Sequence, residues 1–170
     1  MNSKRILVPL DLRRSTTDAL LYLQQAAPET PFSATLLYVV ELNIAAPDRR
    51  LYQEICAESL AALRQLSLLF LGHPDAAQVS VRLGRADEQI LAEARSSRSE
   101  LIILSGSKPR PWRHLFRSRT IERVGLAAPC PTLVLPPSWQ AASAQGRPQA
   151  RSEKAPPRSA CRPHPTWAGA

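Results

Sequence analysis

The chain has 170 residues with a formal net charge of +8; 44% of the residues are hydrophobic and 21% are charged. This composition is that of a folded domain and excludes a chain that is disordered throughout. Three widely spaced cysteines without a Cys-x-x-Cys pair exclude a disulfide scaffold and a thiolate zinc site, and they favour a reducing cytoplasm. The longest apolar stretch, residues 66–71, is far too short to span a membrane, so we expect a cytoplasmic protein.

The order of apolar runs along the chain predicts five strands that alternate with four helices. Each strand is a short, almost unbroken apolar run, and the strands are predicted at residues 5–10, 34–40, 78–83, 101–105 and 132–135. Apolar residues recur at helical spacing in the intervening segments, namely before Pro28, at residues 48–71, after Gly84 and at residues 120–126. Such runs suit strands that are buried on both faces of a parallel sheet. The sequence therefore predicts an α/β fold, a single doubly wound sandwich with a five-stranded parallel sheet in the order 3-2-1-4-5.

The composition changes sharply near Pro136. Residues 137–170 contain no Ile, Leu, Val, Phe or Met, so they have almost nothing to bury. We therefore expect a domain of residues 1–136, followed by a disordered tail rich in proline, alanine and arginine. Positive charge is concentrated in this tail and in residues 108–123, where six basic residues accompany one acidic residue. Because such cations repel one another, we expect residues 108–123 to form a mobile basic loop that binds an anion weakly.

Ligands on a doubly wound sheet bind beyond the carboxyl ends of the strands, where the strand order reverses. The loop after the first predicted strand begins at Asp11 and contains no glycine, which excludes the glycine-rich loop of a dinucleotide-binding domain. The phosphate-binding sequence Gly-x4-Gly-Lys-Ser is also absent. The third strand ends at Leu83-Gly84 without a carboxylate, so Asp11 lacks the acidic neighbour that a phosphate-accepting receiver domain needs.

Five motifs, in order and in register, resemble the universal stress protein family and together cover the predicted domain. Residues 6–11 (ILVPLD) resemble the family's opening I-L-V-P-x-D, and residues 36–40 (LLYVV) resemble its second strand. Residues 84–94 match its turn after the third strand, and residues 100–107 (ELIILSGS) resemble D-L-I-V-M-G-S/T. Residues 122–135 resemble the ending E-R-V…A-P-C-P-V-L-V-V. The resemblance implies a flavodoxin-like sandwich of the adenine-nucleotide α-hydrolase-like type, and a homodimer that pairs through the last strand.

The resemblance breaks in the segment that decides nucleotide binding. Family members that hold ATP carry G-x2-G-x9-G-S/T after the fourth strand, and its glycines let backbone N–H groups reach the phosphates. Here Gly106 matches the first position, but Pro109, which has no N–H group, stands at the second. The last pair is replaced by Arg119-Thr120 or, in the other alignment, by Ser118-Arg119. The nucleotide-binding candidates that the resemblance implies are Pro9, Asp11, Val39, Gly106, Arg119 and Thr120.

Several of the singled-out residues have a purely structural alternative. Asp11 is placed to touch a ribose or adenine, or else it caps the first loop and meets no ligand. Thr120 either contacts phosphate or caps the last helix, and Cys56, on the inward stripe of the long helix, is expected in the core. The histidines lie in unrelated positions without a carboxylate at suitable spacing, so we expect no metal site and no catalytic residue.

These observations leave several functions open. The leading hypothesis is a non-catalytic universal stress protein-like domain that acts in the stress response or its regulation through a partner surface, with a degenerate nucleotide-binding motif and no required cofactor. The alternative is a stress protein that binds ATP and holds the phosphates with the arginines of residues 108–123, since arginine grips phosphate bidentately. A nucleotide-hydrolysing enzyme lacks a visible base, nucleophile or metal cluster, and a nucleic-acid binder is supported by charge alone. We expect no membrane partner.

Overall fold

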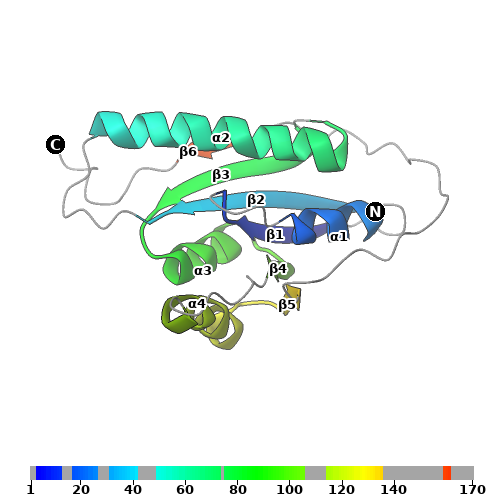
Figure 1. Ribbon diagram of the computed structural model, residues 1–170. Helices are drawn as coiled ribbons and strands as arrows, with labels where there is room; N and C mark the ends of the chain where they lie inside the picture. Colours follow the sequence, from blue (N-terminus) through cyan, green and yellow to red (C-terminus); the bar gives the residue numbers. More distant parts are fainter. Residues whose placement is uncertain are drawn as a thin grey trace.

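The computed structural model describes residues 3–12, 17–26, 31–41, 49–73, 75–105, 114–135 and 159–161, with the backbone alone at residues 26, 114–119 and 159–161. Within these residues, strands and helices alternate along the chain up to the last strand (Figure 1). The strands are β1 (Lys4–Leu10), β2 (Phe32–Val40), β3 (Ala77–Leu83), β4 (Leu101–Ser105), β5 (Thr132–Leu135) and β6 (Ser159–Cys161). The helices are α1 (Asp18–Ala26), α2 (Arg49–Leu71), α3 (Ala86–Ser96) and α4 (His114–Ala127). No helix in the described part of the chain is long and apolar enough to cross a membrane.

The strands form one parallel sheet in the order β5-β4-β1-β2-β3-β6. Its first five strands confirm the predicted order 3-2-1-4-5. β1 lies in the middle and pairs with β2 from Lys4 opposite Phe32 to Leu10 opposite Tyr38, so both faces of β1 must be covered. The sequence anticipated this burial, because four of the seven β1 residues are aliphatic, and the other three are a proline and the two basic residues that open the strand.

Helices cover both faces of the sheet and divide the core into two layers (Figure 1). Alternate strand residues point to opposite faces, as the pleat of a strand requires. One layer packs side chains of α1 and α2 against the sheet and contains Val8, Leu36 and Val81. The other packs α3 and α4 against the sheet and contains Leu7 and Leu37. Neighbouring residues of one strand therefore belong to different layers, which explains the unbroken apolar runs.

The structure corrects two expectations about the end of the domain. The last helix begins at His114 rather than at Thr120, because no proline or glycine interrupts residues 114–124 and leucine and arginine favour a helix. Thr120 is therefore inside α4 and does not cap it. The second correction is β6, a short strand at residues 159–161 within the tail that was expected to be disordered. The rest of that tail, and the boundary at residue 136, lie outside the described residues.

The cysteines also depart from expectation in one respect. Cys56 is buried in the core as predicted, with 2% of its surface exposed, but it is disulfide-bonded. Cys130 is a free thiol, half-buried beside the α3–α4 layer, and burial raises the pKa of its thiol. Excluding a multi-disulfide scaffold therefore did not exclude a single disulfide, since cysteine spacing cannot show which residues the fold brings together.

Candidate functional site

The strand order reverses beside β1, because β2 follows on one side of it and β4 lies on the other. The crevice beyond the carboxyl ends of β1 and β4 is therefore the place where this architecture binds ligands. Asp11 directly follows β1 and is half-buried, and Pro9 is half-buried within β1 itself. Val39 is half-buried near the end of β2 and packs against the α3–α4 layer. The structure thus brings Pro9, Asp11 and Val39 to one end of the sheet.

The remaining predicted site residues belong to the segment after β4. Gly106 lies outside the described residues, as do Pro109 and the start of the expected basic loop. The backbone of Arg119 lies in α4, and Thr120 is half-buried in the same helix. Whether these residues meet a nucleotide stays a prediction.

A residue that the sequence reasoning missed occupies the site from the side of β2. Glu41 follows β2, and its Oε1 accepts a hydrogen bond of 2.8 Å from the backbone N–H of Ala86, the first residue of α3. The N-cap residue Arg85 makes no side-chain capping bond to α3. The carboxylate of Glu41 therefore does what a capping residue does, and it places a negative charge at the positive end of the helix dipole. The carboxylate of Glu41 therefore already occupies the N-terminus of α3.

The turn that leads into α3 is fixed by a glycine. Gly84 has a φ of +132°, a conformation that side chains rarely adopt, and its N–H donates a 3.1 Å hydrogen bond to the carbonyl of Val40. A Cβ added at Gly84 would lie 3.1 Å from Nε2 of Gln89, so the site leaves little room for one. The turn at Gly84 thus places the backbone N–H of Ala86, at the start of α3, within hydrogen-bond distance of Glu41. This explains structurally why glycine and alanine occur at this spacing, as in the family motif.

An ion-pair cluster joins α3 to α4 beside this turn. Asp87 is buried, and its Oδ2 accepts hydrogen bonds of 2.9 Å from Arg85 and of 2.9 Å from Arg123. Arg85 also lies 3.1 Å from a carboxylate oxygen of Glu88. This corrects part of the prediction for residues 108–123, since Arg123 already has an acidic partner and needs no ligand to neutralise it. Two acidic residues thus lie in the first turn of α3, and both are paired with arginines.

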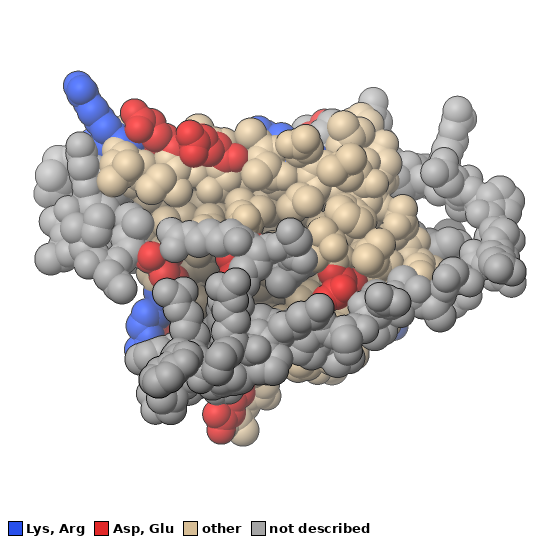
Figure 2. Space-filling view, in the orientation of Figure 1, with Lys and Arg blue, Asp and Glu red and all other residues tan. Residues whose placement is uncertain are grey.

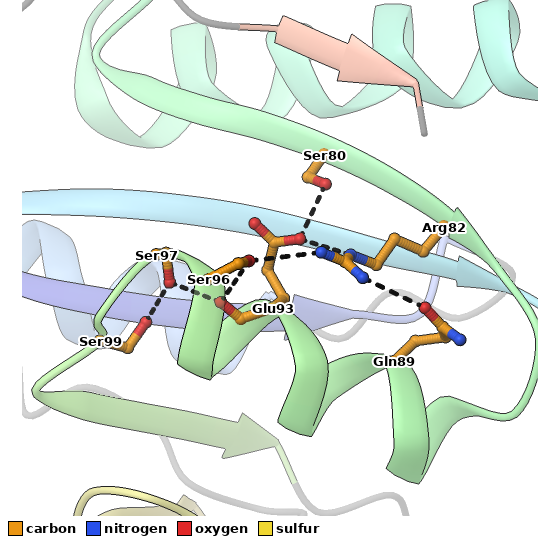
Figure 3. A network of polar contacts seen from close by, with 7 residues as sticks. All are labelled: Ser80, Arg82, Gln89, Glu93, Ser96, Ser97 and Ser99. Atoms are coloured by element: carbon orange, nitrogen blue, oxygen red, sulfur yellow. Dashed lines mark hydrogen bonds and ion pairs between the residues drawn. The ribbon is translucent and has the colours of Figure 1, made fainter. Parts of the chain in front are cut away.

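A second polar cluster holds α3 against β3 (Figure 3). The buried carboxylate of Glu93 accepts hydrogen bonds from the guanidinium of Arg82 and from the hydroxyl of Ser80. The same guanidinium donates to Oε1 of Gln89 and to Oγ of Ser96, each at 3.3 Å. Arg82 lies opposite Val39 in the strand register, at the end of the sheet where a nucleotide would sit. Because Glu93, Gln89 and Ser96 all bind its guanidinium, Arg82 has a structural role.

A further residue at the crevice was not anticipated. The hydroxyl of Ser105, the last residue of β4, is buried and finds no hydrogen-bond partner among the described residues. A buried hydroxyl without a partner is uncommon in proteins. The only signal in the sequence was a single polar residue that closes the most apolar strand. The hydroxyl of Ser105 thus lies beside the strand reversal without a partner among the described residues. In the described part of the chain, no three His, Cys, Asp or Glu residues gather as a metal ion would require.

The comparison with protein families decides the classification. The universal stress protein family matches residues 2–136 of this chain. The chain belongs to the universal stress protein family. The match covers every described element from β1 to β5 and leaves β6 outside. No curated protein matched the chain.

Solved structures of universal stress proteins share the fold. The universal stress protein UspA from Lactobacillus plantarum is 20% identical, covers 79% of this chain and 99% of its own, and superimposes with a TM-score of 0.63. A universal stress protein solved in complex with cAMP is 11% identical, covers 81% of this chain and 100% of its own, and has a TM-score of 0.58. At these identities the similarity establishes the architecture, and it says nothing about which residues of this chain hold a ligand.

Proposed function

We propose that this universal stress protein domain is non-catalytic and acts in the stress response through protein contacts, with a nucleotide site that has lost much of its affinity. One observation carries the proposal: proline stands at position 109, where family members that hold ATP have a glycine whose N–H group reaches the phosphates. The carboxylate of Glu41, which caps the N-terminus of α3 at the same end of the sheet, adds a negative charge that opposes a phosphate.

The residues that the resemblance implies for the base end of a nucleotide favour the alternative. Pro9, Asp11 and Val39 lie together at the end of the sheet, and Ser105 offers a hydroxyl. A structural relative was solved with cAMP, which supports the alternative that this chain binds a nucleotide. In that alternative, the arginines of residues 108–123 hold the phosphates of ATP. Arg123 contributes little to it, because Asp87 already binds its guanidinium.

Mass spectrometry of small molecules released from the freshly purified protein tests the proposal. We expect substoichiometric nucleotide or none. Recovery of close to one ATP per chain would support the ATP-binding alternative, and conversion of that ATP to ADP by the purified protein would contradict the non-catalytic assignment.

A charge-neutral variant sharpens this test. In Glu41→Gln the amide oxygen still accepts the hydrogen bond from Ala86, but the negative charge at the start of α3 is gone. We expect ATP to bind this variant more tightly than wild type in a low-salt titration. Glu54→Gln removes an exposed charge from α2 and is the matched control, which we expect to bind like wild type. Equal affinities of all three proteins would show that Glu41 does not weaken the site.

We also propose that two copies pair through β5. This strand ends the sheet, and none of the described strands covers its outer edge. Its Val134 is 45% exposed and Leu126 of α4 is 84% exposed. An apolar strand edge of this kind favours pairing with a second copy, which would remove both side chains from water.

A further inference from the structure

The opposite edge of the sheet is covered by the chain's own C-terminal segment. β6 lies beside β3 and close to α2 (Figure 1). It runs parallel to β3, with Val79 opposite Ser159 and Val81 opposite Cys161. Residues 84–158 separate β6 from β3 along the chain. Three residues of pairing are a small return for the entropy that is lost when two such distant segments meet, so a further restraint is needed to explain why β6 stays in place.

The cysteines supply that restraint. Cys56 is disulfide-bonded, Cys130 is a free thiol, and the chain has three cysteines. Within one chain, elimination leaves Cys161 as the partner of Cys56. Cys56 belongs to the buried stripe of α2, together with Tyr52 and Leu63.

The strand register agrees with this pairing. Val81 is fully buried in the same core layer as Cys56. Residues that lie opposite each other on neighbouring strands share a face of the sheet, so position 161 is on the face that α2 covers. The helix α2 contacts both β3 and β6. The assignment by elimination and the strand register thus point to the same residue.

We propose that a disulfide between Cys56 and Cys161 locks β6 onto the edge of β3, and that reduction of this disulfide uncovers the edge. The pair is thus a redox modification site that lies outside the nucleotide crevice. When it forms from two thiols, a small-molecule disulfide such as oxidised glutathione accepts two electrons and two protons and leaves as two thiols. A dithiol reductant reverses the reaction: it becomes a disulfide itself and returns two protons and two electrons to Cys56 and Cys161.

The physical consequence lies at the backbone of β3. In the locked state, β6 satisfies the outward N–H and C=O groups of β3 between Val79 and Val81. In the reduced state, only the pairing of three residues holds β6 at this edge, and the conformational entropy that these residues regain favours their release. The exposed groups of β3 then form an open strand edge, the kind of surface to which extended peptides add as a further strand.

Peptide mapping of the full-length protein tests the lock directly. The protein is purified without reductant, treated with N-ethylmaleimide and digested with trypsin without reduction. Cys56 lies in the peptide Leu51–Arg64, and Cys161 lies in Ser159–Ala170, because trypsin does not cleave between Arg162 and Pro163. We expect these two peptides to be linked and the peptide with Cys130 to carry the maleimide. Maleimide on all three cysteines, or a link to the Cys130 peptide, would overturn the proposal, as would covalently joined chains on a denaturing non-reducing gel.

Hydrogen exchange tests the release of β6. We expect amides of residues 77–83 to be protected in the oxidised protein and to lose protection on reduction. Cys161→Ser should exchange like the reduced protein under both conditions. Cys130→Ala is the matched control, and it should keep the redox dependence of wild type. If β3 exchanges equally in oxidised and reduced wild type, the disulfide does not hold β6 and the proposal is wrong.

Discussion

The two edges of the sheet solve the same physical problem in different ways. A sheet edge presents backbone N–H and C=O groups that can recruit another chain. At the β3 edge, β6 covers these groups, and Val79 and Val81 are 3% and 0% exposed. At the β5 edge, none of the described strands takes that place, and Val134 is 45% exposed. One edge is therefore closed from within the chain, and we propose that the other is closed by a second copy.

The difference follows from what each edge has beside it. The β3 edge has α2 above it, which contributes a buried stripe and Cys56, and α3 on the other face, which contributes the buried Glu93. Space-filling shows acidic side chains over the first half of α2 and mainly uncharged side chains over its second half on the face in view (Figure 2). The β5 edge is short, and the neighbouring α4 ends in exposed apolar residues such as Leu126. A long supported edge can hold three residues of its own tail, whereas a short apolar edge needs a larger partner.

The largest effect is expected from breaking the support that α3 gives to β3. Arg82→Met removes the guanidinium and leaves the carboxylate of Glu93 buried without its cation. We expect a loss of about 3–5 kcal/mol in the free energy of unfolding, which chemical denaturation measures. Adding Glu93→Leu to this variant should restore much of the loss, because the uncompensated buried charge is gone.

A matched control separates this effect from the loss of any arginine. Arg95→Gln removes an exposed arginine of α3, and we expect the free energy of unfolding of this variant to stay within about 0.5 kcal/mol of wild type. An Arg82→Met protein as stable as this control would mean that Glu93 finds other partners or water. The covered edge would then not depend on α3.

The next effect concerns the lock on the β3 edge. Because the proposed disulfide closes a very long loop, reduction should lower the free energy of unfolding by about 2–4 kcal/mol. Urea denaturation with and without a dithiol reductant measures this difference. Cys161→Ser should abolish it and Cys130→Ala should preserve it. If the wild-type protein had the same free energy of unfolding with and without reductant, the disulfide would not stabilise the β3 edge.

The elements were largely predictable from the sequence, whereas the contacts between them were not. Apolar runs located β4 and β5 to the residue, because strands buried on both faces leave few polar positions to blur the ends. β6 has the sequence Ser-Ala-Cys, which carries no strand signal of its own, so only the neighbouring β3 makes it a strand. Strand propensity depends on what a segment packs against, and that information is not local.

The candidate site shows the same limit. Asp11 and Val39 could be placed from the resemblance, because each follows or ends a recognisable strand. The hydrogen bond between Glu41 and Ala86 joins residues 45 positions apart, and that between Asp87 and Arg123 joins residues 36 apart. No spacing rule links such residues, although both acidic partners stand where the chain leaves a strand or enters a helix. The charge of residues 108–123 was visible in the sequence, but the partner that neutralises Arg123 was not.

A smaller effect is expected at the β5 edge. Val134→Lys places a charge on the surface that we propose for dimerisation. We expect the dimer to dissociate at least about tenfold more readily, equivalent to about 1.4 kcal/mol. Sedimentation equilibrium at micromolar concentration measures this shift. Leu69→Lys changes a still more exposed apolar residue, which lies on α2, and should leave the dimer intact. If Leu69→Lys weakened the dimer and Val134→Lys did not, the interface would lie on α2 and not on β5.

The smallest effect is a pH dependence at the covered edge. Burial raises the pKa of the Tyr52 hydroxyl on α2, and the charge of Arg82 partly offsets this. A raised pKa in the folded state means that the unfolded chain loses this proton first. The resulting stability is complete below the ordinary pKa of 10.0 and is lost as pH rises through the higher folded value. Above that ordinary value, Tyr52→Phe should show a shallower fall in unfolding free energy than wild type, and equal slopes would contradict the buried location of this hydroxyl.

Native mass spectrometry of the protein purified without reductant tests the contrast between the edges most directly, because it weighs the assembly and its chains in one experiment. The account predicts a dimer without bound nucleotide. Acid denaturation without reductant should separate this dimer into single chains, each lighter than the reduced chain by two hydrogen atoms. That result means a disulfide within each copy at one edge and non-covalent pairing at the other. Chains that stay covalently joined, or single chains at the fully reduced mass, would contradict it.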